Sequence, residues 1–194
     1  MSSRVLRSSR TVTRSLKTQA VTLGASLAAA WTTLGVNVLA GGALLRFGIV
    51  PRTTGGLVGI LAAPFLHANM AHLLANSVPF LIFGWLVMLR DRRHFGVVTL
   101  AAVLGSGVLS WTLGAPNTVH IGASGVVFGY FGFLLLAGWY ARSAGSIAIS
   151  LAVAVLWGGT LMGVLPGTPG VSWQGHLGGF VGGVWAARRF RAHA

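Results

Sequence analysis

Long runs of uncharged residues dominate the chain and predict membrane-spanning helices. Four stretches contain no Asp, Glu, Lys or Arg: residues 18–45, 53–89, 94–141 and 143–187. One crossing of a bilayer needs about 20 apolar residues. The first two stretches therefore hold one span each, with a re-entrant or loop segment ahead of the second span. The last two are each long enough for two spans and a turn.

Turn-forming residues interrupt the two longest stretches where those turns are expected. They are Gly-Ala-Pro-Asn at residues 114–117 and Pro-Gly-Thr-Pro-Gly at residues 166–170. All spans should be helical, because an open strand edge cannot be satisfied in lipid. The sequence thus predicts an all-α integral membrane protein, a compact bundle of six transmembrane helices. Their expected ranges are 20–44, 72–89, 94–114, 122–141, 146–165 and 175–187.

Composition supports the membrane class and excludes several others. Hydrophobic residues make up 54% of the 194 residues, charged residues only 8%, and the mean hydropathy is +0.78. A soluble domain carries about 25% charged residues. The 29 glycines suit helices packed closely in lipid, and the absence of cysteine excludes disulfides and thiolate zinc sites. The net charge of +13 lies in short clusters between spans, so the expected partner is a lipid bilayer and not a nucleic acid.

These clusters also predict the topology. With the N-terminus in the cytoplasm, only Arg46 and Arg52 lie outside, and the other 12 basic residues lie inside. Cytoplasmic loops are enriched in Lys and Arg, so both termini are expected in the cytoplasm. The protein itself is expected in the plasma (inner) membrane. Residues 1–17 are expected to be a disordered basic tail, residues 18–190 the six-helix domain, and residues 191–194 a cytoplasmic C-terminal tail.

Four polar side chains recur at the start of alternate spans. His72 and Asn76 begin the second predicted helix, Ser124 begins the fourth, and His176 begins the sixth. These three helices run in the same direction, so the four residues share one depth near the extracytoplasmic face. Polar groups within a membrane are costly and are functional candidates by default. His72 and Asn76, four residues apart, share a helix face.

Glycine patterns indicate which of these helices touch. Gly125 and Gly129 form a small-residue face on the fourth predicted helix, and His176, Gly179 and Gly183 form a stripe on the sixth. Such faces let two helix backbones approach closely. The fourth and sixth helices are therefore expected to pack together and to bring Ser124 to His176.

The inventory of acidic residues narrows the chemistry. Asp91 is the only carboxylate side chain, and it lies among Arg90, Arg92 and Arg93 in a predicted inner loop. A Ser-His-Asp triad, a two-aspartate protease, an HExxH metalloprotease and carboxylate-driven proton transport are all excluded. A Ser-His dyad remains. No metal site and no cofactor are predicted.

Three motifs begin the second, fourth and sixth predicted helices: His72-x-x-x-Asn76, Gly122-x-Ser124-Gly125 and His176-x-x-Gly179. No single motif is specific, but the set occurs in a fixed order on these helices. Over residues 20–190 the chain thereby resembles the rhomboid family of intramembrane serine proteases. The segment Pro64-Phe-Leu-His67, ahead of the second predicted helix, also resembles the family.

The resemblance implies a role for each matching residue. Ser124 would be the nucleophile and His176 its general base and later general acid. His72, Asn76 and the backbone N–H of Ser124 would stabilise the oxyanion. Substrates would be transmembrane helices, cleaved near their extracytoplasmic ends. The supporting residues would be Gly122, Gly125, Gly179 and Phe128, the aromatic residue that packs against the imidazole.

Other interpretations of the same residues remain open. A serine in a Gly-rich helix is often a packing residue bonded to its own backbone, a membrane histidine is often structural, and Asn76 could merely bridge helices. His67 is expected to be structural, and His94, His120 and His193 carry no functional signal. The alternative functions are an inactive rhomboid-like protein that binds transmembrane helices, and a small channel or transporter. The sequence predicts no oligomeric state.

Overall fold

The chain folds into helices joined by short connections. The computed structural model describes residues 3–90 and 92–190, whose regular structure is helical apart from one isolated bridge between Ile49 and His120. This confirms the all-α class. Three 3₁₀ helices, η1 Ala43–Phe47, η2 Ala63–Phe65 and η3 Gly158–Val164, accompany the α-helices. The α-helices are α1 Ser3–Leu39, α2 Thr54–Ala62, α3 Met70–Arg90, α4 Arg92–Leu113, α5 Ser124–Ala141, α6 Ala144–Trp157 and α7 Trp173–Arg189.

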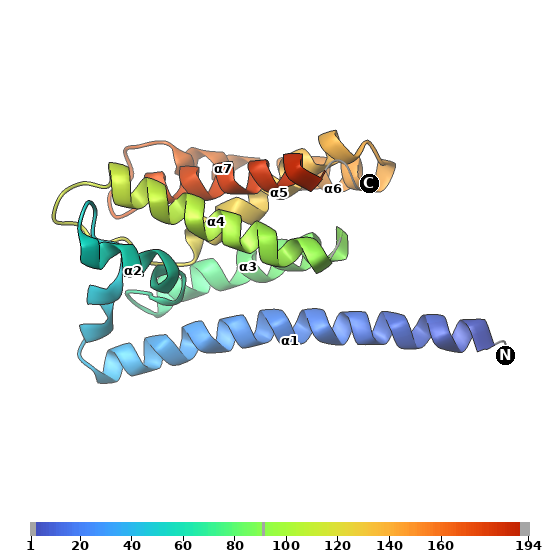
Figure 1. The fold of residues 1–194 in the computed structure, drawn as a ribbon, viewed down its shortest axis with the longest axis horizontal. Coiled ribbons are helices and arrows are strands. Elements are labelled where there is room, and N and C mark those ends of the chain that lie inside the picture. The colour runs from blue at the N-terminus through green and yellow to red at the C-terminus, as the bar shows by residue number, and fades with distance from the viewer. Residues whose placement is uncertain (1–2, 91, 191–194) are drawn as a thin grey trace.

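Several of these helices are long and apolar enough to span a membrane, so the chain is a multi-pass membrane protein. Within the described residues, five segments meet that criterion. The sixth expected span, α7, is 17 residues long and lies against α4 and α5 in the bundle (Figure 1). The five segments are Ser15–Leu39, Met70–Arg90, His94–Leu113, Ser124–Ala141 and Ala144–Val164.

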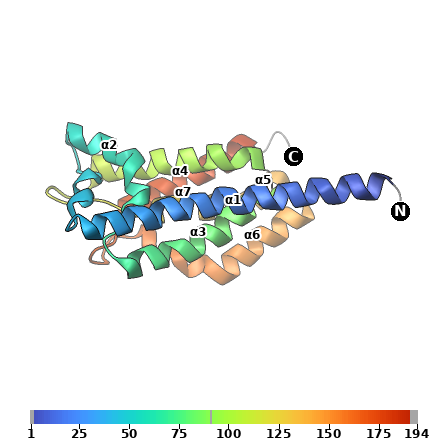
Figure 2. The ribbon, with the colours of Figure 1, turned by 90° about the horizontal axis from the view of Figure 1, so that it is seen from below.

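Three boundaries differ from the prediction. Helix α1 begins at Ser3, so residues 3–17 of the predicted disordered tail are helical; no Gly or Pro interrupts the chain before Gly24. Figure 2 shows α1 extending past the other helices at its N-terminal end. The segment ahead of α3 contains the short helix α2, and α6 gives way to a 3₁₀ helix at Gly158. Residues 1–2, Asp91 and the predicted C-terminal tail, 191–194, lie outside the described residues.

Glycines on two faces of α7 hold the bundle together. A methyl group on Gly179 would collide with the carbonyl oxygen of Gly125 on α5, and one on Gly178 would collide with that of Gly105 on α4. Gly183 and Gly182 repeat the two contacts one turn later. The predicted contact between the helices of Ser124 and His176 is confirmed, and the second glycine face, toward α4, was not predicted.

Helices α3, α5 and α7 begin at the same end of the bundle, which the short helix α2 and the loop before α5 also reach (Figure 1). The predicted turns occur there as expected. Asn117 has a φ of 60°, and Gly167 and Gly170 have φ values of 126° and 75°. These left-handed residues reverse the chain after α4 and before α7, and they place the starts of α5 and α7 side by side.

Candidate active site

A cavity of about 710 Å³ opens at the end of the bundle where α3, α5 and α7 begin. Its walls include all four polar residues singled out from the sequence, which come from three different helices. They are His72, Asn76, Ser124 and His176. The cavity is also lined by polar side chains from the loop before α5 and from the start of α7. The cavity thus gathers several polar side chains at one end of a mostly apolar bundle.

Ser124 is the first residue of α5, and the backbone before it is held in a defined turn. Gly122 has a φ of 108°, a left-handed conformation that side chains rarely adopt, and its N–H donates to the carbonyl of Ala63 at 2.8 Å. The N–H of Ala123 donates to Nε2 of His67 at 3.3 Å. The first N–H groups of a helix have no partner within it and carry the positive end of the helix dipole. Ser124 thus lies where such N–H groups gather.

His176 is oriented by two contacts on its ring. Its Nδ1 lies 2.8 Å from the carbonyl oxygen of Gly163 in η3, and its ring stacks on Phe128 with centroids 4.1 Å apart and planes 12° apart. A carbonyl can only accept, so Nδ1 carries the hydrogen and Nε2 keeps its lone pair in the neutral ring. This is the tautomer that a general base acting through Nε2 requires.

His72 and Asn76 lie against Gly122, two residues before Ser124. A methyl group on Gly122 would come within 2.7 Å of His72 Nε2, so the His72 ring would have to shift, and it would be in ordinary contact with Asn76 Nδ2 at 3.9 Å. Asn76 is 5% exposed, and its Nδ2 donates one hydrogen to the carbonyl of His72 at 2.8 Å. The second hydrogen of that amide remains for another acceptor.

His67 supports this wall from behind. It is 1% exposed, it accepts the Ala123 N–H, and its ring meets that of His72 edge-on with centroids 5.0 Å apart. The pKa of His67 is lowered to about 4, mainly by burial and to a smaller extent by the neighbouring His72. His67 therefore stays neutral at physiological pH and acts as a hydrogen-bond acceptor. The structural role expected from the sequence agrees with these contacts.

A second serine–histidine pair lies in the same cavity and was not predicted. Nδ1 of His120 lies 2.6 Å from Oγ of Ser172, and Nε2 lies 3.1 Å from Oγ1 of Thr118. The backbone of His120 pairs with Ile49, and Ser172 caps α7 by accepting the N–H of Gly175 at 3.3 Å. Burial lowers the pKa of His120. A serine before a Gly-rich helix predicts a helix cap from the sequence. The hydrogen bond of Ser172 to His120, 52 residues earlier, cannot be predicted in this way.

Comparison with known proteins identifies the family. The sequence profile of the Rhomboid domain matches residues 54–192. This chain belongs to the rhomboid family. Relatives of this rhomboid domain include an uncharacterised protein of Mycobacterium tuberculosis, 42% identical over 160 residues, which are 78% of this chain and 67% of the relative. RHOMBOID-like protein 4 of Arabidopsis thaliana is 30% identical over 132 residues, 64% of this chain and 32% of that protein.

The fold of this rhomboid chain brings together the predicted residues without assigning their chemistry. Phe128 stacks on the ring of His176, Gly122 lies beside His72 and Asn76, and Gly125 lies against Gly179. His120, to which the sequence assigns no functional signal, lies in the cavity wall.

Proposed function

We propose that this rhomboid protein is an intramembrane serine endopeptidase that uses a dyad of Ser124 and His176. The observation that carries the proposal is the single cavity lined by both residues together with His72 and Asn76. Three helices contribute these side chains, and a merely structural serine or histidine would not need such convergence. The fixed Nδ1–H tautomer of His176 supports the same role.

In the proposed reaction, Ser124 Oγ attacks the carbonyl carbon of a peptide bond while its proton passes to His176 Nε2. The resulting imidazolium is stabilised through the bond from Nδ1 to Gly163 and through the Phe128 ring. The proton then passes to the leaving nitrogen as the C–N bond breaks, and an acyl-enzyme remains. Water attacks the carbonyl carbon of the ester and gives one proton to Nε2. That proton then passes to Ser124 Oγ as the bond between Oγ and the acyl carbon breaks, which releases the new carboxylic acid and regenerates the dyad.

The oxyanion of each tetrahedral intermediate would face a group of neutral donors. These are the side chain of His72, the free hydrogen of the Asn76 amide and the backbone N–H of Ser124. Donors that are aimed in advance at developing charge lower the barrier by about 3 kcal/mol each in a site sheltered from water. The packing of His72 and Asn76 against Gly122 provides that fixed aim.

A carboxylate is not part of this mechanism. The chain has one acidic residue, Asp91, which follows Arg90 at the end of α3. His72 and Arg90 are 18 residues apart on that helix, about 27 Å along its axis at 1.5 Å per residue. The carbonyl of Gly163 orients His176 in place of the aspartate of a triad.

The proposed substrates are transmembrane helices of other proteins, cleaved near their extracytoplasmic ends. The excess of basic residues on one side favours both termini in the cytoplasm and the cavity on the extracytoplasmic side of a plasma membrane. The alternative is an inactive rhomboid-like protein that binds such helices without cleaving them. Retention of both Ser124 and His176 favours the enzyme.

Covalent labelling tests the proposal without knowledge of a substrate. Purified protein in mild detergent is treated with a fluorophosphonate, and the adduct is located by peptide mass spectrometry. The expected result is one adduct on Ser124, which is lost in Ser124→Ala and in His176→Ala. Ser172→Ala is the matched control, because it removes the serine of the other pair, and it should still be labelled on Ser124.

Two results would contradict the proposal. Folded parent protein that takes up no fluorophosphonate would favour the inactive relative. An adduct on Ser172 that survives in Ser124→Ala would assign the reaction to the pair with His120. Unfolding temperatures of each variant separate loss of chemistry from loss of fold.

A further inference from the structure

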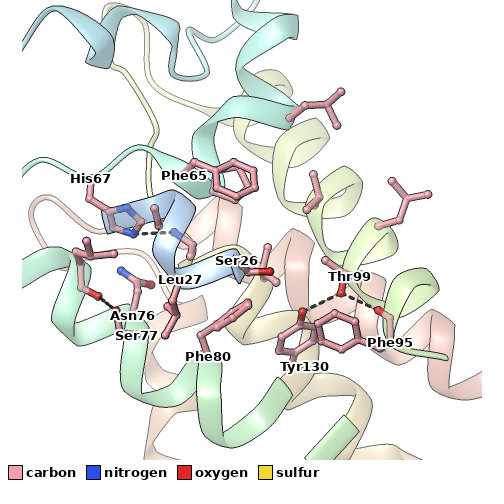
Figure 3. A pocket seen from close by; sticks show the side chains of 18 of the residues that line it. Ser26, Leu27, Phe65, His67, Asn76, Ser77, Phe80, Phe95, Thr99 and Tyr130 are labelled. Carbon is pink, nitrogen blue, oxygen red and sulfur yellow. Dashed lines mark hydrogen bonds between the residues drawn. The ribbon is translucent and has the colours of Figure 1, made fainter. Parts of the chain in front are cut away.

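A second cavity, of about 470 Å³, lies next to the first, and Asn76 lines both of them. Figure 3 shows its labelled side chains, with His67 and Asn76 at one end, Thr99 and Tyr130 at the other, and Leu27 and Phe80 between them. Residues of α1, α3, α4 and α5 form its walls, and no Asp, Glu, Lys or Arg is among the residues that line it. The lining is overwhelmingly apolar.

We infer that this cavity is a binding site for an acyl chain of a bilayer phospholipid. The first argument is continuity with the lipid-facing surface. Leu61, Phe65 and Leu100 line the cavity and are also exposed on the outside of the bundle. Helix α1 packs mainly on α3 and η2 and only sparsely on α4, so the cavity has a mouth on that side. The surface around this mouth faces hydrocarbon in a membrane.

The second argument is the shape of the cavity. Its lining residues extend over similar lengths on three helices: Leu73 to Phe80 on α3, Phe95 to Val103 on α4, and Ala123 to Tyr130 at the start of α5. Seven residues of helix correspond to about 10 Å. The cavity thus extends about 10 Å along the bundle axis, which is the direction in which acyl chains run beside a spanning helix.

The third argument concerns volume and chemistry. One turn of helix with its side chains fills a cylinder about 10 Å across and 5.4 Å high, roughly 400 Å³. The cavity could hold little more than one such turn, so a transmembrane helix of a partner does not fit. Water is a poor occupant of an apolar cavity, because it needs two to four polar partners. A flexible hydrocarbon chain matches both the size and the lining.

Photolabelling in a defined bilayer tests this inference, and it needs no proteolytic activity. The full chain is placed in nanodiscs of phosphatidylcholine that carries a diazirine on its acyl chain, irradiated, and mapped by peptide mass spectrometry. Adducts are expected on Phe80 and Val126, which line the inner wall and are buried from the lipid-facing surface. Val155 on α6, 82% exposed, reports ordinary contact with the bilayer.

Variants that fill the cavity supply the specific test. Gly96 lines the cavity and has open space where a side chain would begin, so Gly96→Phe should reduce labelling of Phe80 and Val126 at least fivefold. Ser26→Phe, on the opposite wall, should do the same. Gly35→Phe on α1 is the matched control, because Gly35 also has open space around it but does not line the cavity. Labelling of Val155 should stay constant in all three.

Labelling confined to Val155, with none on the inner wall of the folded parent protein, would overturn the inference. Equal labelling of the inner wall in the parent and both filled variants would overturn it as well. Labelling of Phe80 by a photoreactive transmembrane peptide, and not by the lipid, would assign the cavity to a partner helix instead.

Discussion

Phe128 and His176 stack face to face across the contact between α5 and α7, with ring centroids 4.1 Å apart. The two residues come from the helices that also carry Ser124 and the glycine contacts, so the orientation of the imidazole depends on how closely α5 and α7 approach. Phe128 is 6% exposed and lies one turn after Ser124. The aromatic ring therefore links the helix that carries Ser124 to the imidazole of His176.

Replacing this ring should slow the reaction more than it harms the fold. Phe128→Leu keeps an apolar side chain but removes the flat surface that holds the imidazole, and we expect the fluorophosphonate labelling rate to fall about tenfold, which corresponds to about 1.4 kcal/mol. Phe128→Tyr keeps the ring and should label within about twofold of the parent protein. Equal rates for the Leu variant and the parent would show that stacking does not position His176.

The proposed oxyanion donors can be removed without emptying the site. Asn76→Leu and His72→Phe keep the approximate volume of each side chain, and each should slow labelling of Ser124 by about 10²-fold. Ser77→Ala is the neighbouring control, because Ser77 donates only to the carbonyl of Leu73 in its own helix. A rate for Asn76→Leu as high as that of Ser77→Ala would remove Asn76 from the mechanism.

The close approach of α5 and α7 should tolerate no side chain. Gly179→Ala would force a methyl group against the backbone of Gly125, and we expect destabilisation of about 1–3 kcal/mol together with loss of labelling. Gly145→Ala on α6 meets open space and should be neutral or slightly stabilising. Thermal unfolding in detergent compares the two variants with the parent. An unchanged unfolding temperature for Gly179→Ala would contradict the packing described here.

His67 should make stability depend on pH in the acidic range. Its pKa is about 4 in the folded protein and 6.5 in the unfolded chain, so the unfolded chain binds more protons between these values. Stability therefore falls as the pH drops from about 6.5 toward 4, and it recovers above 6.5, where both states are neutral.

His67→Gln keeps an acceptor for the Ala123 N–H but cannot titrate. When the pH is lowered from 7.5 to 4.5, the unfolding temperature of the parent protein should fall further than that of this variant. Since the other histidines titrate in both proteins, the difference between the two curves isolates His67. Identical pH dependence in the two proteins would contradict the lowered pKa.

Much of the fold could be predicted because its signals are local. Charge-free stretches and turn residues located the long helices, and the glycine spacing on α5 and α7 predicted their contact. The sequence places the start of the first span well after Ser3, because its basic, polar composition is typical of disorder, but the segment contains no helix breaker and α1 begins at Ser3. The short helix α2 was missed because an apolar segment of about ten residues has no distinctive length.

The polar site was predictable in part for the same reason. His72, Asn76, Ser124 and His176 stand out as polar residues at corresponding depths of alternate spans. The pair of His120 and Ser172 does not, because its geometry depends on a loop and a helix cap that only the folded chain brings together. The apolar cavity beside the site could not be predicted from the sequence either, because its volume is the space that the packed helices leave unfilled.

Asn76 lines both cavities, so one side chain acts as a partition between two solvents. In the proposed reaction, peptide hydrolysis consumes water on one side of this side chain, whereas the proposed acyl chain lies on the other side. Shortening this residue, as in Asn76→Ala, would remove a donor and also breach the partition. The two proposals together therefore place a boundary between water and hydrocarbon at Asn76, through which the lipid composition of the membrane can act on the proposed reaction.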